Sequence, residues 1–139
     1  MDVLSPAQRH KNMSHIRSID SKPEEIVRKY LFSRGFRYRK NDKRFPGKPD
    51  IVLPKYNKIV FVNGCFWHQH ANCKYASKPK TNTAFWEEKL QKNAARDQSE
   101  YALLARMGWD IIVVWECELA TKEKAQTRLE QLEREIISR

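Results

Sequence analysis

Cysteines are few and long apolar runs are absent in this 139-residue sequence, and acidic residues are outnumbered by basic ones. Each of these features excludes some classes of protein. The 3 cysteines cannot all pair within one chain, which argues against a disulfide framework and for a reducing, cytoplasmic setting. No apolar run approaches the roughly 20 residues that a membrane-spanning helix needs, so we expect no membrane partner. Residues 1–20 are polar and basic without an apolar centre, and we expect no secretory signal in them.

The excess of basic over acidic residues gives the chain a strong positive charge. Asp and Glu number 17 against 27 Lys and Arg, so the formal net charge is +10. Basic side chains that neutralise phosphates release condensed counterions, which makes nucleic acid the default partner of such a chain. A basic domain that is merely soluble has the same composition, but we favour the nucleic-acid interpretation.

The hydrophobic pattern predicts a single α/β domain over residues 1–139, with a central mixed sheet flanked by helices. Helices are expected at 21–35, 83–107 and 121–138, and strands at 36–39, 51–53, 58–62 and 109–115. Residues 1–20 show little periodicity and are interpreted as a semi-ordered basic arm or a short surface helix. The first helix is expected to begin at a capping box made by Ser21 and Glu24.

The irregular segment expected at 63–81 holds a metal-ligand pattern. Cys65, His70 and Cys73 are spaced Cys-x4-His-x2-Cys, and Cys117 follows the last expected strand. Ligands of this kind suit a closed, tetrahedral zinc site of structural type, which would order a loop that is poor in apolar residues. Spacing alone leaves His68 open as the ligand in place of His70. Buried apolar cysteines are the alternative, but the surrounding loop is polar.

A second cation is suggested by a carboxylate at the start of a strand. Asp50 follows the Pro46–Pro49 turn, so its side chain should project at the mouth of the sheet. An Asp on one hairpin strand and a backbone carbonyl near Val62 on the next can together hold Mg²⁺. Such an ion would stabilise charge on a phosphate and activate a water. An ordinary turn aspartate is the competing interpretation.

His68 is a candidate general base or acid for phosphodiester hydrolysis, with Asp97 on the long helix to orient it. Taken singly, Asp97 fits an exposed helix charge equally well, and Glu24 fits a capping residue.

Bulky aromatic residues in and beside the polar loop have two possible roles. Phe66 and Trp67 lie inside the loop, and Trp86 begins the long helix just after it. Apolar side chains inserted between base steps unstack and deform duplex DNA, whereas the usual place of Phe and Trp is a core. Both roles stay open for these three residues. Core packing is expected for Phe85, Trp109 and Trp115.

Five segments together resemble the very short patch repair (Vsr) endonucleases. They are Pro46-Gly47-Lys48-Pro49-Asp50, Val62-Asn63-Gly64-Cys65-Phe66-Trp67-His68-Gln69-His70, Phe85-Trp86 with Lys89, Asn93 to Asp97, and Val114-Trp115-Glu116-Cys117. The resemblance extends over about residues 9–119. It implies a restriction-endonuclease-like fold and an enzyme that nicks duplex DNA on the 5′ side of the thymine of a T:G mismatch, the product of 5-methylcytosine deamination.

The resemblance also implies a role for each candidate residue. It implies Asp50 as the main Mg²⁺ ligand with the backbone carbonyl of Val62, His68 as the catalytic histidine supported by Asp97, and Glu24 near the reacting phosphate. It implies a structural Zn²⁺ on Cys65, His70, Cys73 and Cys117, and insertion of Phe66, Trp67 and Trp86 beside the mismatch. The implied partners are mismatched DNA and, functionally, a cytosine-5 methyltransferase and mismatch-repair proteins. A monomer at the bacterial nucleoid is expected.

The sequence departs from the family pattern at Asn63, where many members carry a second active-site histidine. The second acidic residue and the lysine usual in the restriction-endonuclease superfamily cannot be identified, so a variant metal site is expected. Two other functions remain as alternatives: a restriction-like nuclease that cuts an intact methylation site, and a zinc-containing DNA-binding module without catalysis.

Overall fold

The computed structural model describes residues 21–138, and the arm expected at 1–20 lies outside them. Within this range one mixed sheet has the strand order β1-β2-β3-β4. Its strands are β1 (Arg39–Lys40), β2 (Ile51–Leu53), β3 (Lys58–Asn63) and β4 (Asp110–Trp115). The β1–β2 and β2–β3 pairs are antiparallel, and the β3–β4 pair is parallel. The predicted α/β domain with a mixed sheet is therefore confirmed for these residues.

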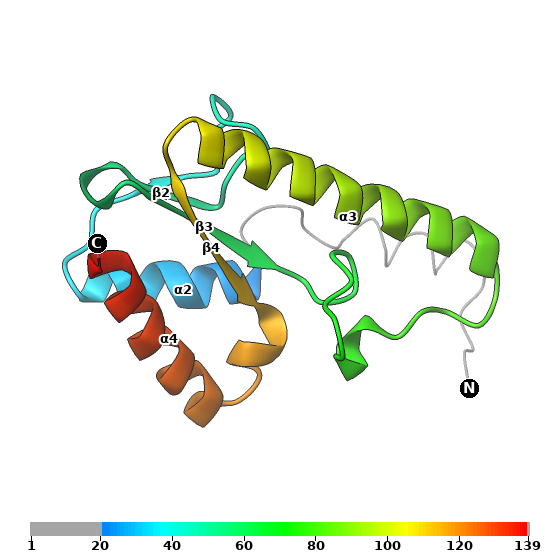
Figure 1. The fold of residues 1–139 in the computed structure, drawn as a ribbon. Helices are drawn as coiled ribbons and strands as arrows, with labels where there is room; N and C mark the ends of the chain where they lie inside the picture. Colours follow the sequence, from blue (N-terminus) through cyan, green and yellow to red (C-terminus); the bar gives the residue numbers. More distant parts are fainter. Residues whose placement is uncertain (1–20, 139) are drawn as a thin grey trace.

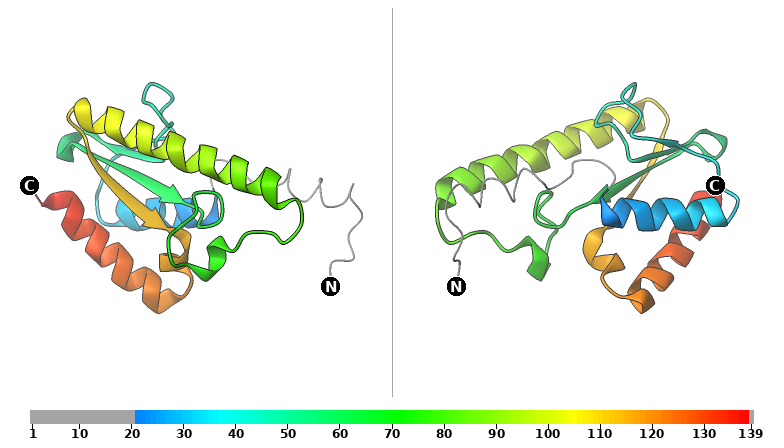
Figure 2. Two further views of the ribbon diagram at one scale, coloured as in Figure 1. Left: turned by 45° about the vertical axis from the view of Figure 1, so that its right-hand side comes forward. Right: turned by 180° about the vertical axis from the view of Figure 1, so that it is seen from behind.

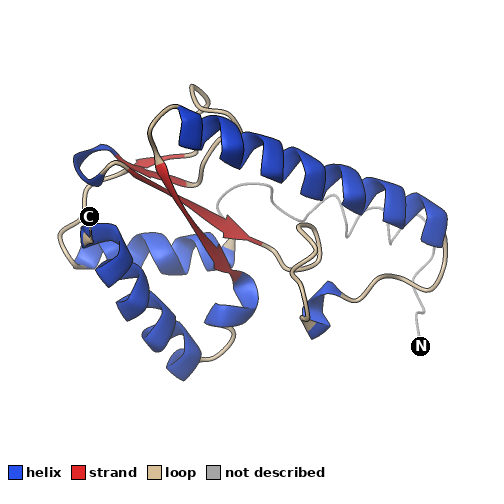
Figure 3. Cartoon of the chain, in the orientation of Figure 1, coloured by secondary structure: helices blue, strands red, loops and turns tan. Residues whose placement is uncertain are grey.

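Helices cover both faces of the sheet (Figures 1 and 3). The helices α2 (Lys22–Ser33) and α4 (Lys122–Ile137) lie on one face, and α3 (Thr83–Arg106) crosses the other. Among residues 21–138, no helix is both long and apolar enough to cross a bilayer.

Alternation along β3 divides the buried side chains into two cores, because successive residues of a strand point to opposite faces. Val60 and Val62 belong to a large core with α2 and α4, whereas Phe61 belongs to a smaller one with Leu104 of α3. The large core contains Val27, Leu31, Phe36, Ile51, Leu53, Val60, Val62, Ile112, Val114, Leu119, Leu129, Leu132 and Ile136. Asn63, two residues after Phe61, consequently has its side chain on the face of α3.

The helix α2 begins at the predicted Ser21 cap, and it ends in a motif that corrects one expected strand. The hydroxyl of Ser21 accepts the Glu24 N–H at 3.4 Å. At the other end, Gly35 has φ +90, its N–H donates to the Phe32 carbonyl, and Phe36 N–H reaches back to Leu31. These are the two bonds of a Schellman motif, whose following residue packs against the helix. Phe36 is therefore buried in the core, and the strand predicted at 36–39 is reduced to β1.

The helix α3 is longer than the sheet it covers, which corrects an expected core residue. Its C-terminal half packs on the smaller core, and its N-terminal half extends past the ends of β3 and β4 (Figure 2). Only Leu90 and Leu104 are buried along its length. Phe85, expected in the core, is 57% exposed because the helix there has no sheet beneath it.

Candidate active site and metal centre

The candidate functional side chains gather where β2 begins, where β3 ends and along the middle of α3. A continuous series of contacts joins the three places. The Asp50 carboxylate accepts the backbone N–H of Val62 at 2.6 Å. The next residue, Asn63, donates from Nδ2 to the Tyr101 hydroxyl at 2.8 Å. Tyr101 lies one helical turn after Asp97 on α3, so strand and helix groups face one another.

Two carboxylates from different elements meet at the start of β2. Glu24 comes from α2, is 3% exposed and accepts Nη1 of Arg28 at 3.2 Å. Burial, reinforced by the charge of Glu24, raises the pKa of Asp50 to about 8. Two neighbouring acidic groups repel one another, and a divalent cation bound between Asp50 and Glu24 would offset that repulsion. The donor set therefore fits a hard cation such as Mg²⁺.

The backbone carbonyl of Val62 can serve as a third oxygen. The N–H and carbonyl of a residue in an extended strand point to the same neighbour, so this carbonyl also faces the side of Asp50. The antiparallel register pairs Ile51 with Val60, and continuing it by two residues sets Val62 opposite Pro49. Proline has no N–H to donate. The strand ladder thus offers the Val62 carbonyl no donor, and it is suited to a metal ion instead.

His68 and Asp97 form a close pair between the loop and α3. Nδ1 of His68 lies 2.5 Å from Oδ2 of Asp97, and the two side chains are 31% and 15% exposed. The loop is also held to the helix by Asn93, whose Nδ2 donates to the Trp67 carbonyl at 3.3 Å. The Asp97 carboxylate fixes the tautomer in which Nδ1 carries the proton and Nε2 is left free to accept one.

The candidate metal cluster comes together as the resemblance implied. Ligand atoms of Cys65, His70, Cys73 and Cys117 all lie within 4.8 Å of one another. Nδ1 of His70 is 3.7 Å from Sγ of Cys65 and 3.4 Å from Sγ of Cys117. A tetrahedral zinc with bonds of about 2.3 Å to sulfur and about 2.05 Å to nitrogen separates those atoms by about 3.6 Å. The cluster can therefore hold one tetrahedral ion.

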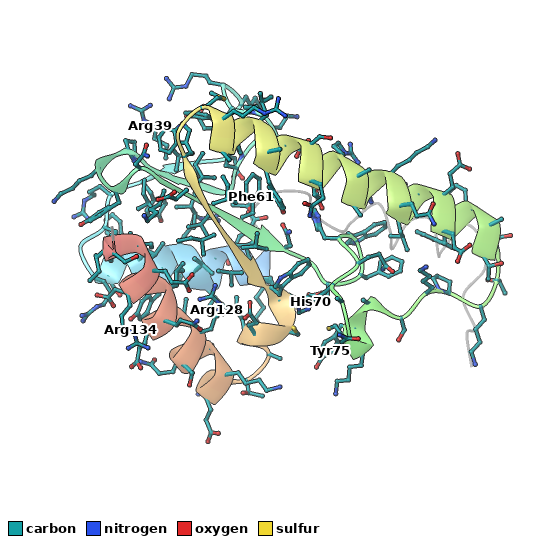
Figure 4. The ribbon with its side chains drawn as sticks, viewed as in Figure 1. Arg39, Phe61, His70, Tyr75, Arg128 and Arg134 are labelled. Carbon is teal, nitrogen blue, oxygen red and sulfur yellow. The ribbon has the colours of Figure 1, made fainter. Side chains whose placement is uncertain are left out.

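Residues at the end of β4 support this cluster. The His70 ring stacks on Trp115 with centroids 4.1 Å apart and an interplanar angle of 8°. Glu116 accepts the Cys65 N–H at 2.9 Å. Figure 4 shows His70 between the loop and the short 3-10 helix η3 (Glu116–Leu119) that follows β4. Trp115, expected in a core, is instead half-buried beside a candidate ligand because the strand ends there.

The three loop-side aromatic residues form their own cluster outside both cores. Ring centroids of Phe66 lie 5.0 Å from Trp67 and 5.5 Å from Trp86, and the two Trp rings are 6.0 Å apart. All three are half-buried, and Phe85 lies 5.3 Å from Trp86 at the exposed side. Trp109 packs edge-on against Phe45 on the smaller core, as expected.

Two residues of α3, Glu100 and Tyr101, lie at the site but are not among the residues predicted from the sequence. Burial raises the pKa of Tyr101 to about 12 and, together with Asp97, raises the pKa of Glu100. A Cβ added to Gly47 would lie 2.5 Å from Oε2 of Glu100, so the β1–β2 loop approaches the helix closely there. The signal that finds both residues is helical spacing, because they follow Asp97 by three and four positions on one face.

Comparisons with known proteins show the family to which the sequence is similar. The family model described as DNA mismatch endonuclease Vsr matches residues 1–74. A type II nicking enzyme of Neisseria meningitidis serogroup A is 51% identical over 135 residues, which are 97% of this chain and 96% of the relative. A type II nicking enzyme of Xanthomonas oryzae pv. oryzae is 43% identical over 131 residues, covering 94% and 96%. The DNA mismatch endonuclease Vsr of Escherichia coli K12 is 40% identical over 123 residues, covering 88% and 78%.

Proposed function

The chain belongs to the Vsr family of DNA mismatch endonucleases, and we propose that it nicks duplex DNA on the 5′ side of the thymine of a T:G mismatch in a Mg²⁺-dependent reaction. The observation that carries the proposal is the series of contacts that leads from Asp50, through Val62, Asn63 and Tyr101, to the His68–Asp97 pair. Such mismatches arise when 5-methylcytosine deaminates. The protein would act as a monomer on chromosomal DNA in the bacterial cytoplasm.

Asp50, with the Val62 carbonyl and the nearby carboxylate of Glu24, would hold the catalytic cation. A bound Mg²⁺ would supply charge to polarise the scissile phosphate and to lower the pKa of a water. Arg28 fixes Glu24 through their 3.2 Å ion pair. The chain's own contribution at this end of the site is to hold these oxygens still on β2, β3 and α2.

His68 would move the proton. Asp97 holds Nδ1, so Nε2 can accept a proton from the attacking water or return one to the leaving oxygen. The imidazolium that forms would be stabilised by the Asp97 carboxylate at 2.5 Å.

The aromatic cluster of Phe66, Trp67 and Trp86 would enter the duplex beside the mismatch. The side chains are bulky, half-buried and outside both cores, so moving them costs little packing. Nζ of Lys89 lies 5.9 Å from the Trp67 ring centroid. A positive charge that can contact a DNA phosphate therefore lies beside the aromatic cluster.

A strand-resolved nicking assay on a panel of mismatched duplexes, with and without Mg²⁺, tests the proposal. We expect one nick 5′ to the thymine, in T:G duplexes only, and no product in chelator. Equal cutting of matched and T:G duplexes would show a restriction-like nuclease instead. Tight binding of DNA without cutting under any metal condition would show a non-catalytic binding module.

We further propose that the Cys65, His70, Cys73 and Cys117 cluster holds a structural Zn²⁺, and two histidine variants test the assignment. His70→Ala should purify without zinc and unfold at a temperature about 10 °C lower, because loss of the ion costs at least about 3 kcal/mol. His68→Ala is the matched control from the same loop and should keep one zinc per chain by elemental analysis. Loss of zinc from His68→Ala with retention in His70→Ala would reverse the ligand assignment.

A further inference from the structure

The hydroxyl of Tyr101 lies inside the proposed site, and no step of the proposed reaction uses it. Tyr101 is held on the face of α3 that carries Asp97, and its ring packs against Phe61 of β3 with centroids 4.9 Å apart. Asn63, 3% exposed, fixes the hydroxyl from the strand side through the 2.8 Å hydrogen bond. Two rigid elements therefore determine where this oxygen sits.

The hydrogen bond from Asn63 also determines what the hydroxyl can still offer. A tyrosine hydroxyl can accept and can donate one hydrogen bond. The Asn63 amide occupies its acceptor side, so the O–H proton points elsewhere. Burial keeps the group neutral, since the pKa of Tyr101 is raised to about 12. A neutral, oriented donor is left at the site.

The neighbours of Tyr101 show which part of the site the donor occupies. Asn63, which donates to the hydroxyl, directly follows Val62, whose N–H donates to Asp50, and Asp97 lies one helical turn before Tyr101 on α3. The hydroxyl thus lies between the cation-binding side and the proton-transfer side. A phosphate held between Asp50 and His68 would present a non-bridging oxygen to this position.

We infer that Tyr101 is a catalytic hydrogen-bond donor to a non-bridging oxygen of the phosphate that is cut, and that Asn63 is the residue that positions it. The inference rests on the proposed nicking reaction. Charge grows on those oxygens as the bond to the leaving group breaks, so a fixed donor acts mainly on the transition state. Its loss should lower the turnover rate and leave DNA binding nearly unchanged.

Tyr101→Phe tests the donor, because it keeps the ring on Phe61 and removes only the hydroxyl. Single-turnover nicking of a T:G duplex should fall by about 100-fold, with the Kd for the same duplex in chelator changed by less than about 3-fold. Tyr30→Phe is the matched control. Its hydroxyl donates to Glu133 at 2.7 Å between α2 and α4, away from the site, and its nicking rate should be that of the wild type.

Asn63→Leu tests the positioning role, because leucine has a similar shape and cannot donate. It should slow nicking by about 10-fold alone and add nothing to Tyr101→Phe, since it acts only through the hydroxyl. Wild-type nicking by Tyr101→Phe would overturn the inference and leave the proposed function standing. If the nicking rate, the DNA affinity and the melting temperature all fell together in these variants, the role of Tyr101 and Asn63 would be structural. That result would also overturn the inference. Absence of nicking by the wild-type protein would overturn both proposals.

Discussion

Asp50→Asn should lower the nicking rate at least about 1,000-fold while leaving the affinity for mismatched DNA within about 3-fold. Asparagine keeps the volume of the side chain, and its Oδ1 can still accept the Val62 N–H that Asp50 accepts at 2.6 Å. The change therefore removes the charge that attracts a divalent cation and little else. Single-turnover nicking at several Mg²⁺ concentrations measures the loss.

The control for this substitution is Asp42→Asn in the loop before β2. Asp42 pairs with Arg44 at 2.7 Å, and this guanidinium holds the pKa of Asp42 down at about 2. Its nicking rate should stay within about 3-fold of the wild type. If Asp50→Asn nicked at the wild-type rate in saturating Mg²⁺, the cation would have to be held elsewhere.

Asp50→Asn should also stabilise the folded protein when no metal is present. The pKa of Asp50 is 3.8 in an unperturbed chain and about 8 in the fold, so the folded state favours the protonated acid. The stability from this group is then complete below about pH 4 and is lost progressively as the pH rises toward 8. Urea unfolding in chelator between pH 5 and 8 should show this loss in the wild type and in Asp42→Asn.

Asp50→Asn should lack that slope, and Mg²⁺ should abolish it in the wild type by replacing the proton. The pKa of Asp42 is lowered rather than raised, so its stabilisation is lost only as the pH falls toward 2, outside this window. An unchanged slope in Asp50→Asn would mean that a different group titrates.

His68→Ala should slow nicking by about 100- to 10,000-fold, because the proposed proton acceptor is removed. DNA affinity and zinc content should not change. Asp97→Asn should have a smaller effect of about 10- to 100-fold, since Nε2 of His68 is kept but the tautomer is no longer fixed. Added imidazole should partly restore the rate of His68→Ala and not that of Asp50→Asn.

Glu88→Gln provides the control on the same helix. Glu88 is an exposed acid of α3 that pairs with Lys92 at 2.9 Å, and its loss should not alter the rate. A His68→Ala protein that nicks normally would remove the histidine from the mechanism. A rate of Glu88→Gln as low as that of Asp97→Asn would indicate a general effect of charge along α3.

Most of the fold could be predicted because its elements have local signals. Ser21 at the start of α2 and Gly35 at its end gave bounds close to those observed, and apolar runs gave β2, β3 and β4. Phe36 was placed in a strand because alternation cannot reveal that a Schellman motif buries the residue after the glycine. Phe85 was placed in the core because periodicity gives the face of a helix and not how far that helix extends beyond the sheet.

The site was harder to predict because its partners come from distant elements. Spacing left His68 and His70 equivalent, and the structure separates them: one reaches Asp97, and the other reaches two cysteine sulfurs. Tyr101 is not among the site residues predicted from the sequence. Its role depends on Asn63 facing α3, which follows from strand register and from no local pattern. The direction of the Val62 carbonyl toward the side of Asp50 likewise depends on the register of β2 and β3.

The positions of the four metal-cluster residues bear on how the chain reaches its fold. Cys65, His70 and Cys73 follow β3 directly, and Cys117 follows β4, with the whole α3 crossover between them. Parallel strands joined by a long crossover pair slowly, because the loop must close before the contacts form. An ion captured early by these ligands would close that loop in advance. Refolding monitored by stopped flow should then be faster with zinc than with chelator. The ion would therefore raise the folding rate of the domain as well as its stability.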